Sequence, residues 1–140
     1  MKMIKLILIL SLFTANLKAP PPYMVSIPTK GVIRPYEALW RATCIVESGS
    51  NPYAIGDKHL NKHSYGIAGI RDIRLLDYYQ HTGIRYTVTD MFDVAKSKEV
   101  FMYYCNGTNI EYIARNWNGG NRGFEKDNTI KYWNLIKTKL

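Results

Sequence analysis

The sequence predicts a mostly α-helical α+β domain with one small lobe of turns or short strands. Apolar residues recur at helical spacing in several segments, and stretches rich in Gly, Pro, Asn and Ser separate these segments. A length of 140 residues allows one hydrophobic core. Because 46% of the residues are hydrophobic and 13% are aromatic, the composition is that of a folded protein rather than a disordered chain.

The first 19 residues have the layout of a signal peptide or an N-terminal anchor. Lys2 and Lys5 precede an apolar stretch from Leu6 to Phe13, and small and polar residues follow up to Ala19. This stretch is too short to span a bilayer. We therefore expect export to the periplasm or cell envelope, with membrane contact only through this segment. The alternative is a buried N-terminal helix.

The prolines at 20–22 argue against that alternative, because they separate the first segment from the remainder. Residues 20–34 are Pro-rich and are expected to form a linker, so that the predicted domain covers residues 35–140. The whole chain has a net charge of +8, and without the three lysines of residues 1–19 it is about +5. Such a charge suits an anionic partner such as a bacterial envelope or a nucleic acid, or it serves solubility.

Five helices are expected around the turn-rich segment 50–70. The first begins near Pro35, carries its apolar face up to Glu47 and ends at Ser48-Gly49. Thr89 or Asp90 is the predicted N-cap of the third helix, and Asn109 that of the fourth. The later helices are expected at 71–81, 90–105, 109–117 and from about Asn128 to the end.

Glu47 is an acid at the end of an apolar helix face. Burial disfavours its ionised form, and so does the partial negative charge at a helix C-terminus. Both effects raise the pKa toward the range in which a carboxylic acid can hold a proton near neutrality and donate it to a poor leaving group. The alternative is a glutamate that reaches solvent or pairs with an arginine such as Arg41.

Four short motifs resemble the lysozyme-like superfamily of lytic transglycosylases and phage muramidases. They occur in the family order, and the resemblance covers roughly residues 35–137. The motifs are Glu47-Ser48 with Asn51-Pro52, Ser64-Tyr65-Gly66-Ile67-Ala68-Gly69-Ile70, Trp117-Asn118-Gly119-Gly120, and Thr129-Ile130-Lys131-Tyr132.

The resemblance implies that Glu47 protonates the glycosidic oxygen between N-acetylmuramic acid and N-acetylglucosamine. In a lytic transglycosylase, the same group then takes a proton from the muramyl 6-hydroxyl, a 1,6-anhydro product forms, and no cofactor is needed. It also implies substrate-binding roles for six residues, for each of which a turn or core role is the alternative. These residues are Ser48, Ser64, Gly66, Trp117, Asn118 and Tyr132.

Two residues bear on the type of reaction. Asp57, in a Gly-Asp turn, is the candidate second acid that a hydrolase (muramidase) would need, although Gly-Asp is also common in turns. Gly69 stands where the family usually has Gln, and it cannot give a saccharide the side-chain hydrogen bond of that Gln. A lysozyme-like module that binds glycan or an assembly partner without cleaving it is therefore a further alternative.

Other groups carry weaker predictions. Cys44 and Cys105 form either a disulfide, if the chain is exported, or two buried free thiols. His59 and His63 have the spacing of zinc ligands on a helix, but they lie in the turn-rich segment, so we expect no metal site. The expected partners are peptidoglycan strands and an envelope-spanning secretion, conjugation or phage assembly. Nucleic acid is not expected, because no recognition helix is evident.

Overall fold

The computed structural model describes residues 36–60 and 62–140. They lie in one compact unit, Ile33–Leu140. The signal peptide or anchor and the Pro-rich linker predicted for residues 1–34 lie outside the described residues. The elements are α1 (Glu37–Ser48), β1 (Ile55–Gly56), β2 (Ser64–Tyr65), α2 (Asp72–Thr82), the 3-10 turn η1 (Val88–Phe92), α3 (Val94–Tyr104), α4 (Ile110–Gly119), the 3-10 turn η2 (Gly123–Glu125) and α5 (Asn128–Lys137).

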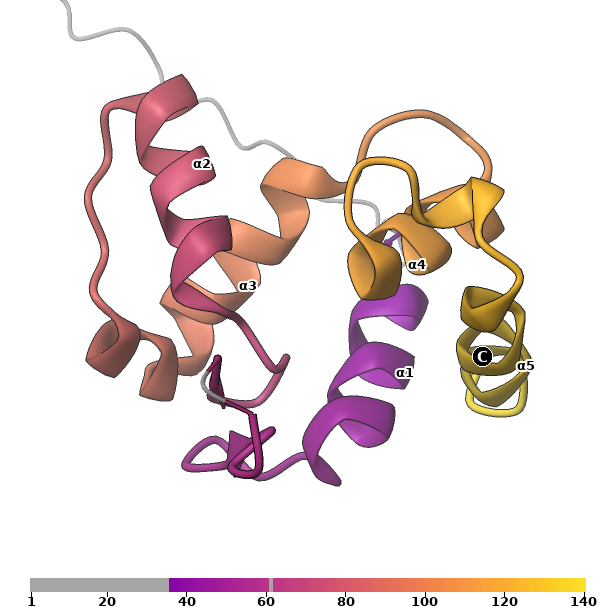
Figure 1. Cartoon of the computed structure of the whole chain (residues 1–140), viewed down its shortest axis with the longest axis horizontal. Helices are drawn as coiled ribbons and strands as arrows, with labels where there is room; N and C mark the ends of the chain where they lie inside the picture. Colours follow the sequence, from indigo (N-terminus) through magenta and orange to yellow (C-terminus); the bar gives the residue numbers. More distant parts are fainter. Residues whose placement is uncertain (1–35, 61) are drawn as a thin grey trace, which may run out of the picture. The chain divides into compact units, whose positions relative to one another are not determined.

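The described residues form five α-helices and one small lobe, which agrees with the predicted mostly α, α+β class. Helices α2 and α3 lie side by side, and α1 lies beside α4 and α5 (Figure 1). The lobe consists of β1 and β2, which pair antiparallel with Ile55 opposite Tyr65 and Gly56 opposite Ser64. The turn-rich segment 50–70 thus forms short strands and loops, as the sequence predicts.

Aromatic contacts join the helices in the core. The Phe101 ring of α3 lies 5.2 Å from the Trp40 ring of α1 and 4.9 Å from the Trp117 ring of α4. Leu39 and Ile136 are fully buried, which places α1 and α5 against the same core. Burial of side chains of this size provides the main stabilisation of the domain, about 1.5–3 kcal/mol for each large apolar side chain.

The predicted start of the third helix was wrong. Instead of one helix over 90–105, η1 precedes α3, and α3 begins only at Val94. The N-cap of α3 is Asp93, whose carboxylate accepts hydrogen bonds from two backbone N–H groups of the first turn. Neither Thr89 nor Asp90 is this N-cap, because both lie inside η1. The Asp90 side chain instead accepts a hydrogen bond from the backbone N–H of Thr87.

The predicted cap of the fourth helix was right. The Asn109 side chain accepts a hydrogen bond from the Tyr112 N–H at 3.0 Å, which satisfies one of the free donors at the start of α4. Within residues 36–60 and 62–140, no helix is long and apolar enough to span a membrane.

Candidate active site

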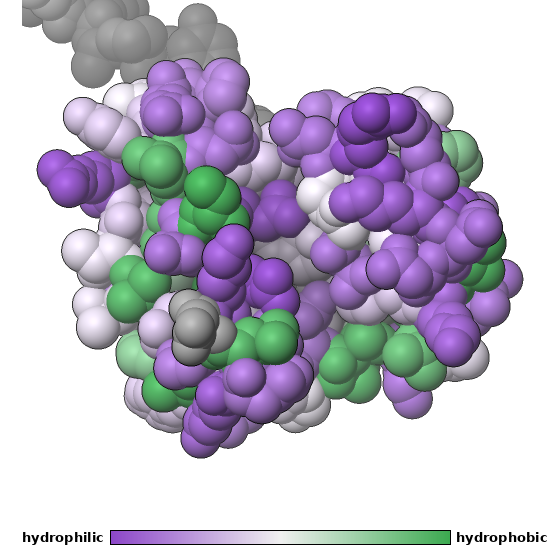
Figure 2. Space-filling model, viewed as in Figure 1, coloured by the Kyte–Doolittle hydropathy of each residue, from purple (hydrophilic) through white to green (hydrophobic). Residues whose placement is uncertain are grey.

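A cleft of about 630 Å³ lies between α2 on one side and the ends of α1 and α4 on the other. Figure 2 shows hydrophilic residues over the α4–α5 connection beside the cleft, and a mixture of apolar and hydrophilic residues over α2. The lining of the cleft includes the two acids singled out in the sequence, Glu47 and Asp57, together with Gly69, Trp117 and Asn118. The volume is within the range of about 300–1,000 Å³ typical of small-molecule sites.

Glu47 is placed at the cleft by the way α1 ends. Gly49 adopts a left-handed conformation (φ +62°), and its N–H closes the last turn on the Ile45 carbonyl. Ser48, which follows Glu47 directly, fixes this end of α1 to the small lobe, because its hydroxyl donates a hydrogen bond of 2.8 Å to the Ile67 carbonyl. The carboxyl group of Glu47 therefore lies in the last turn of α1, held at the boundary between the helices and the lobe.

Tyr132 of α5 contacts the Glu47 carboxyl directly. Its buried hydroxyl donates a hydrogen bond of 2.8 Å to Glu47 Oε1. This contact joins residues 85 positions apart in the chain and fixes the orientation of the carboxyl group. The resemblance implied a substrate-binding role for Tyr132, whereas in the structure its hydroxyl binds the acid and Tyr132 is not part of the cleft lining.

Burial raises the pKa of Glu47 to about 7. The hydrogen bond from Tyr132 opposes this shift, the charge of Asp57 adds to it, and Arg74 and Arg71 oppose it more weakly. Burial therefore dominates, and the carboxyl is half protonated near neutral pH. The alternative of a pair with Arg41 does not hold, because Arg41 is exposed and lies near Glu37 instead.

Gly69 gives the Glu47 carboxyl room to lie against the lobe. It has φ +63°, and a Cβ atom built there would lie 2.7 Å from Glu47 Oε2. A larger residue in this backbone conformation would be strained and would also displace the carboxyl group. With the Glu47 carboxyl group in this position, a glutamine at 69 would require that carboxyl group to move.

Asp57 lines the same cleft but is engaged by an arginine. Arg71 Nη2 lies 2.7 Å from Asp57 Oδ2, and this hydrogen bond lowers the pKa of Asp57. A hydrogen bond with the Ser64 side chain also lowers the pKa of Asp57, by a smaller amount. The two cleft acids therefore differ near pH 6: Asp57 is ionised while Glu47 is mostly protonated. Such a difference is typical of paired catalytic carboxyl groups.

Three of the predicted substrate-binding residues have structural contacts instead of forming the cleft wall. Ser48 joins α1 to the lobe, and Ser64 belongs to β2 and interacts with Asp57. Gly66 is buried under η1, where an added Cβ would lie 1.9 Å from the Met91 carbonyl oxygen. Its lack of a side chain thus serves packing rather than the close approach of a sugar.

Trp117 and Asn118 differ in how they face the cleft. Trp117 is only 6% exposed, and the Arg74 guanidinium lies over its ring at 4.3 Å from the centroid. This ring face is therefore covered and is not free to stack on a sugar. Asn118, by contrast, is exposed and lines the cleft, so its amide can form hydrogen bonds with a ligand.

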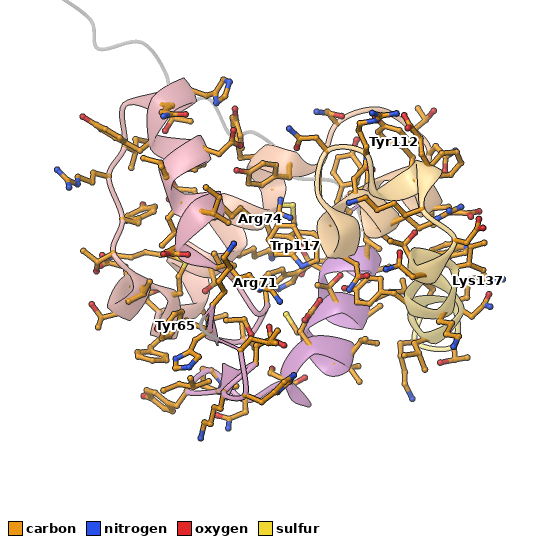
Figure 3. The ribbon with its side chains drawn as sticks, in the orientation of Figure 1. Tyr65, Arg71, Arg74, Tyr112, Trp117 and Lys137 are labelled. Atoms are coloured by element: carbon orange, nitrogen blue, oxygen red, sulfur yellow. The ribbon has the colours of Figure 1, made fainter. Side chains whose placement is uncertain are left out.

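Two arginines at the start of α2, its N-cap Arg71 and Arg74 in its first turn, were not expected from the sequence to take part in the site. Arg71 and Arg74 line the cleft, and Figure 3 shows both near Trp117 in the region between α2 and α4. Their spacing of three residues places them on one face of the helix. That spacing, on a helix directly after the Ser-Tyr-Gly motif, was the available signal, but an i, i+3 basic pair usually marks a solvated helix face.

Cys44 and Cys105 are both buried free thiols, so the candidate disulfide is not formed. Burial raises the pKa of each thiol to about 12. Both groups are therefore neutral and poorly nucleophilic at physiological pH. Among residues 36–60 and 62–140, no three His, Cys, Asp or Glu side chains come together as a metal site.

A solved structure matches this arrangement of helices and lobe. The crystal structure of Tapes japonica lysozyme superimposes with a TM-score of 0.60 and 23% sequence identity, over 72% of this chain and 87% of that chain. The chain has a lysozyme-like fold. No protein-family model and no curated protein matches the sequence.

The lysozyme-like fold confirms the fold class predicted from the four motifs. The finer prediction, a lytic transglycosylase or phage muramidase subtype, stays a prediction. In this lysozyme-like domain, the end of α1, the lobe and α5 bring Glu47, Gly69 and Tyr132 together, and α2 adds two arginines across the cleft. The arrangement can donate a proton to a bound ligand and leave an ionised carboxylate nearby.

Proposed function

We propose that this chain is a glycosidase that cleaves peptidoglycan at the β-1,4 bond between N-acetylmuramic acid and N-acetylglucosamine. The observation that carries the proposal is the state of Glu47, an acid with a pKa of about 7 in the wall of a cleft. A general acid works best when its pKa is near the working pH, because it is then both protonated and able to release the proton. The lysozyme-like fold supports the same substrate class.

Glu47 acts first as the acid. It transfers its proton to the glycosidic oxygen, so that the leaving sugar departs with a neutral hydroxyl group and the muramyl ring carries the positive charge. The hydrogen bond from Tyr132 then stabilises the carboxylate that remains. Since this hydrogen bond lowers the pKa of Glu47, it favours proton release at the moment of bond cleavage.

For the second half of the reaction we propose the transglycosylase route. The Glu47 carboxylate accepts the proton of the muramyl 6-hydroxyl, whose oxygen bonds to the cationic carbon and forms the 1,6-anhydro ring. This route needs one carboxylate. The ion pair with Arg71 supports it, because an acid whose pKa is lowered by an arginine is a weaker base for activating water.

The hydrolase route is the second candidate function. Asp57 lines the same cleft and is ionised while Glu47 is protonated, which is the combination that hydrolysis with two carboxyl groups requires. In that case a water molecule attacks the cationic carbon, and the product has a reducing end. The two routes therefore differ in their product.

We further propose that the protein acts after export, in the periplasm or cell envelope, since its substrate lies there. This part rests on the signal-peptide layout of residues 1–19 and on the basic charge of the chain. The proposed partners are the glycan strands and an envelope-spanning secretion, conjugation or phage assembly that needs a local opening in the wall.

The test is the release of muropeptides from purified peptidoglycan sacculi, with the products identified by mass. We expect release by the wild type, with anhydro products for the transglycosylase route and reducing ends for the hydrolase route. Glu47→Gln should lower the rate at least about 100-fold, because general acid catalysis contributes factors of this size. Glu125→Gln is the matched control, since Glu125 is exposed and pairs with Arg122 outside the cleft.

Asp57→Asn separates the routes further. A transglycosylase should keep most of its anhydro product in this variant, whereas a hydrolase should lose its reducing-end product. Undiminished release by Glu47→Gln would overturn the proposed function. Binding to sacculi without release by the wild type would favour the alternative of a glycan-binding module.

A further inference from the structure

Arg74 is held between two aromatic rings at the cleft. Its guanidinium carbon lies 4.5 Å from the centroid of the Tyr104 ring and 4.3 Å from that of the Trp117 ring. Its Nη2 donates a hydrogen bond of 2.9 Å to the Trp117 carbonyl. These contacts fix the cation in one orientation, and a guanidinium has five N–H donors, more than they use.

The Arg74 charge is not neutralised by an ion pair in the part of the chain that the structure describes. No carboxylate there lies within ion-pair distance of this guanidinium. Of the two acids whose charges act on Arg74, Asp77 accepts a hydrogen bond of 2.6 Å from Tyr104, and Glu47 accepts one of 2.8 Å from Tyr132. Burial lowers the pKa of Arg74, and the charges of Asp77 and Glu47 only partly oppose this shift. An anionic ligand would relieve this cost.

A second, smaller pocket of about 160 Å³ lies beyond Arg74. It shares Arg74, Tyr104, Trp117 and Asn121 with the main cleft, so that Arg74 lies where the two cavities meet. The amides of Asn106, Asn116 and Asn121 line it. Side-chain amides both donate and accept hydrogen bonds, and this suits the backbone of a peptide.

We propose that Arg74 and this pocket (the Arg74 pocket) bind the carboxylate-bearing peptide branch of the glycan strand. The inference rests on the proposed function and names the part of the substrate that is recognised. The sugar rings of the strand have no charge to offer a guanidinium, whereas the peptide on the muramyl unit carries both carboxylates and amide groups. The small volume also fits a narrow chain better than a further disaccharide.

The direct test compares two probes by isothermal titration calorimetry in a Glu47→Gln background, where no cleavage interferes. One probe is the N-acetylglucosamine–N-acetylmuramic acid disaccharide with a tetrapeptide, and the other is the same disaccharide with its lactyl carboxyl group converted to a simple amide, so that it carries neither peptide nor charge. We expect the peptide-bearing probe to bind at least about tenfold more tightly, as a charge-assisted contact allows. Equal affinity for the two probes, or no binding of either, would overturn the inference.

Asn106→Asp tests the pocket itself. Asn106 is exposed and lines only the Arg74 pocket, so the change adds a negative charge there without altering side-chain size. We expect about fivefold weaker binding of the peptide-bearing probe. Asn134→Asp is the matched control, because Asn134 is exposed on α5 and lines neither cavity. The same loss in both variants would mean that the pocket does not bind the peptide.

Arg74→Gln is the complementary variant, in which the tenfold preference for the peptide-bearing probe should disappear. If that variant does not fold, Asn106→Asp carries the test alone. The outcome is separable from the proposed function: sacculus cleavage without peptide preference overturns only the peptide site. Peptide preference without cleavage by the wild type overturns only the enzymatic proposal.

Discussion

Replacing Glu47 by glutamine should stabilise the protein, and the gain should depend on pH. Below pH 4.5 the carboxyl is neutral in both the folded and the unfolded chain, so its burial has little cost. Between pH 4.5 and about 7 the unfolded chain ionises while the folded chain stays protonated, and the free energy of unfolding falls as the pH rises. Above pH 7 the cost is constant.

The size of the effect follows from the pKa difference. A rise from 4.5 to about 7 corresponds to about 3 kcal/mol, since one pKa unit is worth about 1.4 kcal/mol. Glutamine does not ionise, and its side-chain oxygen can still accept the hydrogen bond from Tyr132. The variant should therefore match the wild type near pH 4 and exceed it by about 3 kcal/mol at pH 8.

Urea unfolding followed by tryptophan fluorescence measures this difference. For an m-value of about 1.5 kcal/mol/M, the midpoint at pH 8 should rise by about 2 M urea in Glu47→Gln. Glu125→Gln serves again as the control, because its surface ion pair is worth at most about 1 kcal/mol. A stability difference that stays constant from pH 4 to pH 8 would refute the reasoning that burial raises the pKa of Glu47.

Two further predictions concern the surroundings of the acid, and a third concerns the buried cysteines. Tyr132→Phe should raise the pKa of Glu47 above 7, because it removes the hydrogen bond that favours the carboxylate. NMR titration of the Glu47 side chain measures this pKa, and an unchanged value in the variant would contradict the prediction. Gly69→Ala should destabilise the fold by at least about 1–2 kcal/mol because of the positive φ, and it should lower activity because the added Cβ displaces the Glu47 carboxyl group. Gly83→Ala is the control: Gly83 has a similar φ of +74° but open space around it, so the variant should be destabilised without a loss of activity. The two buried cysteines should not react with a thiol reagent in the native state, since burial raises their pKa to about 12; rapid labelling without denaturant would show that they are accessible.

The helices and the position of the acid could be predicted from the sequence because local rules decide them. Ser48-Gly49 ends α1 just after Glu47, and Asn109 caps α4, since both depend on residues within one turn. The start of α3 could not be predicted in the same way. Two aspartates in the segment can act as caps, and only the competing contact with Thr87 decides between them.

The reasons for the glycines of the third motif also needed the tertiary structure. From the sequence, Gly66 was expected to take part in substrate binding, and Gly69 was expected to lack the hydrogen bond that the family Gln gives a saccharide. In the fold, Gly66 lies against η1 and Gly69 against the Glu47 carboxyl. Whether a missing side chain makes room for a ligand or for another part of the protein depends on neighbours distant in the chain.

The sequence by itself determined a mostly helical domain with an acid at the end of its first apolar helix. Only the tertiary structure decided the surroundings of that acid: a tyrosine 85 positions away donates to it, and Arg74 stacks between two rings across the cleft. The physical reason is that helix formation and termination depend on local backbone and side-chain chemistry. The raised pKa of Glu47 and the lowered pKa of Arg74 instead arise from burial, which exists only once distant helices pack together.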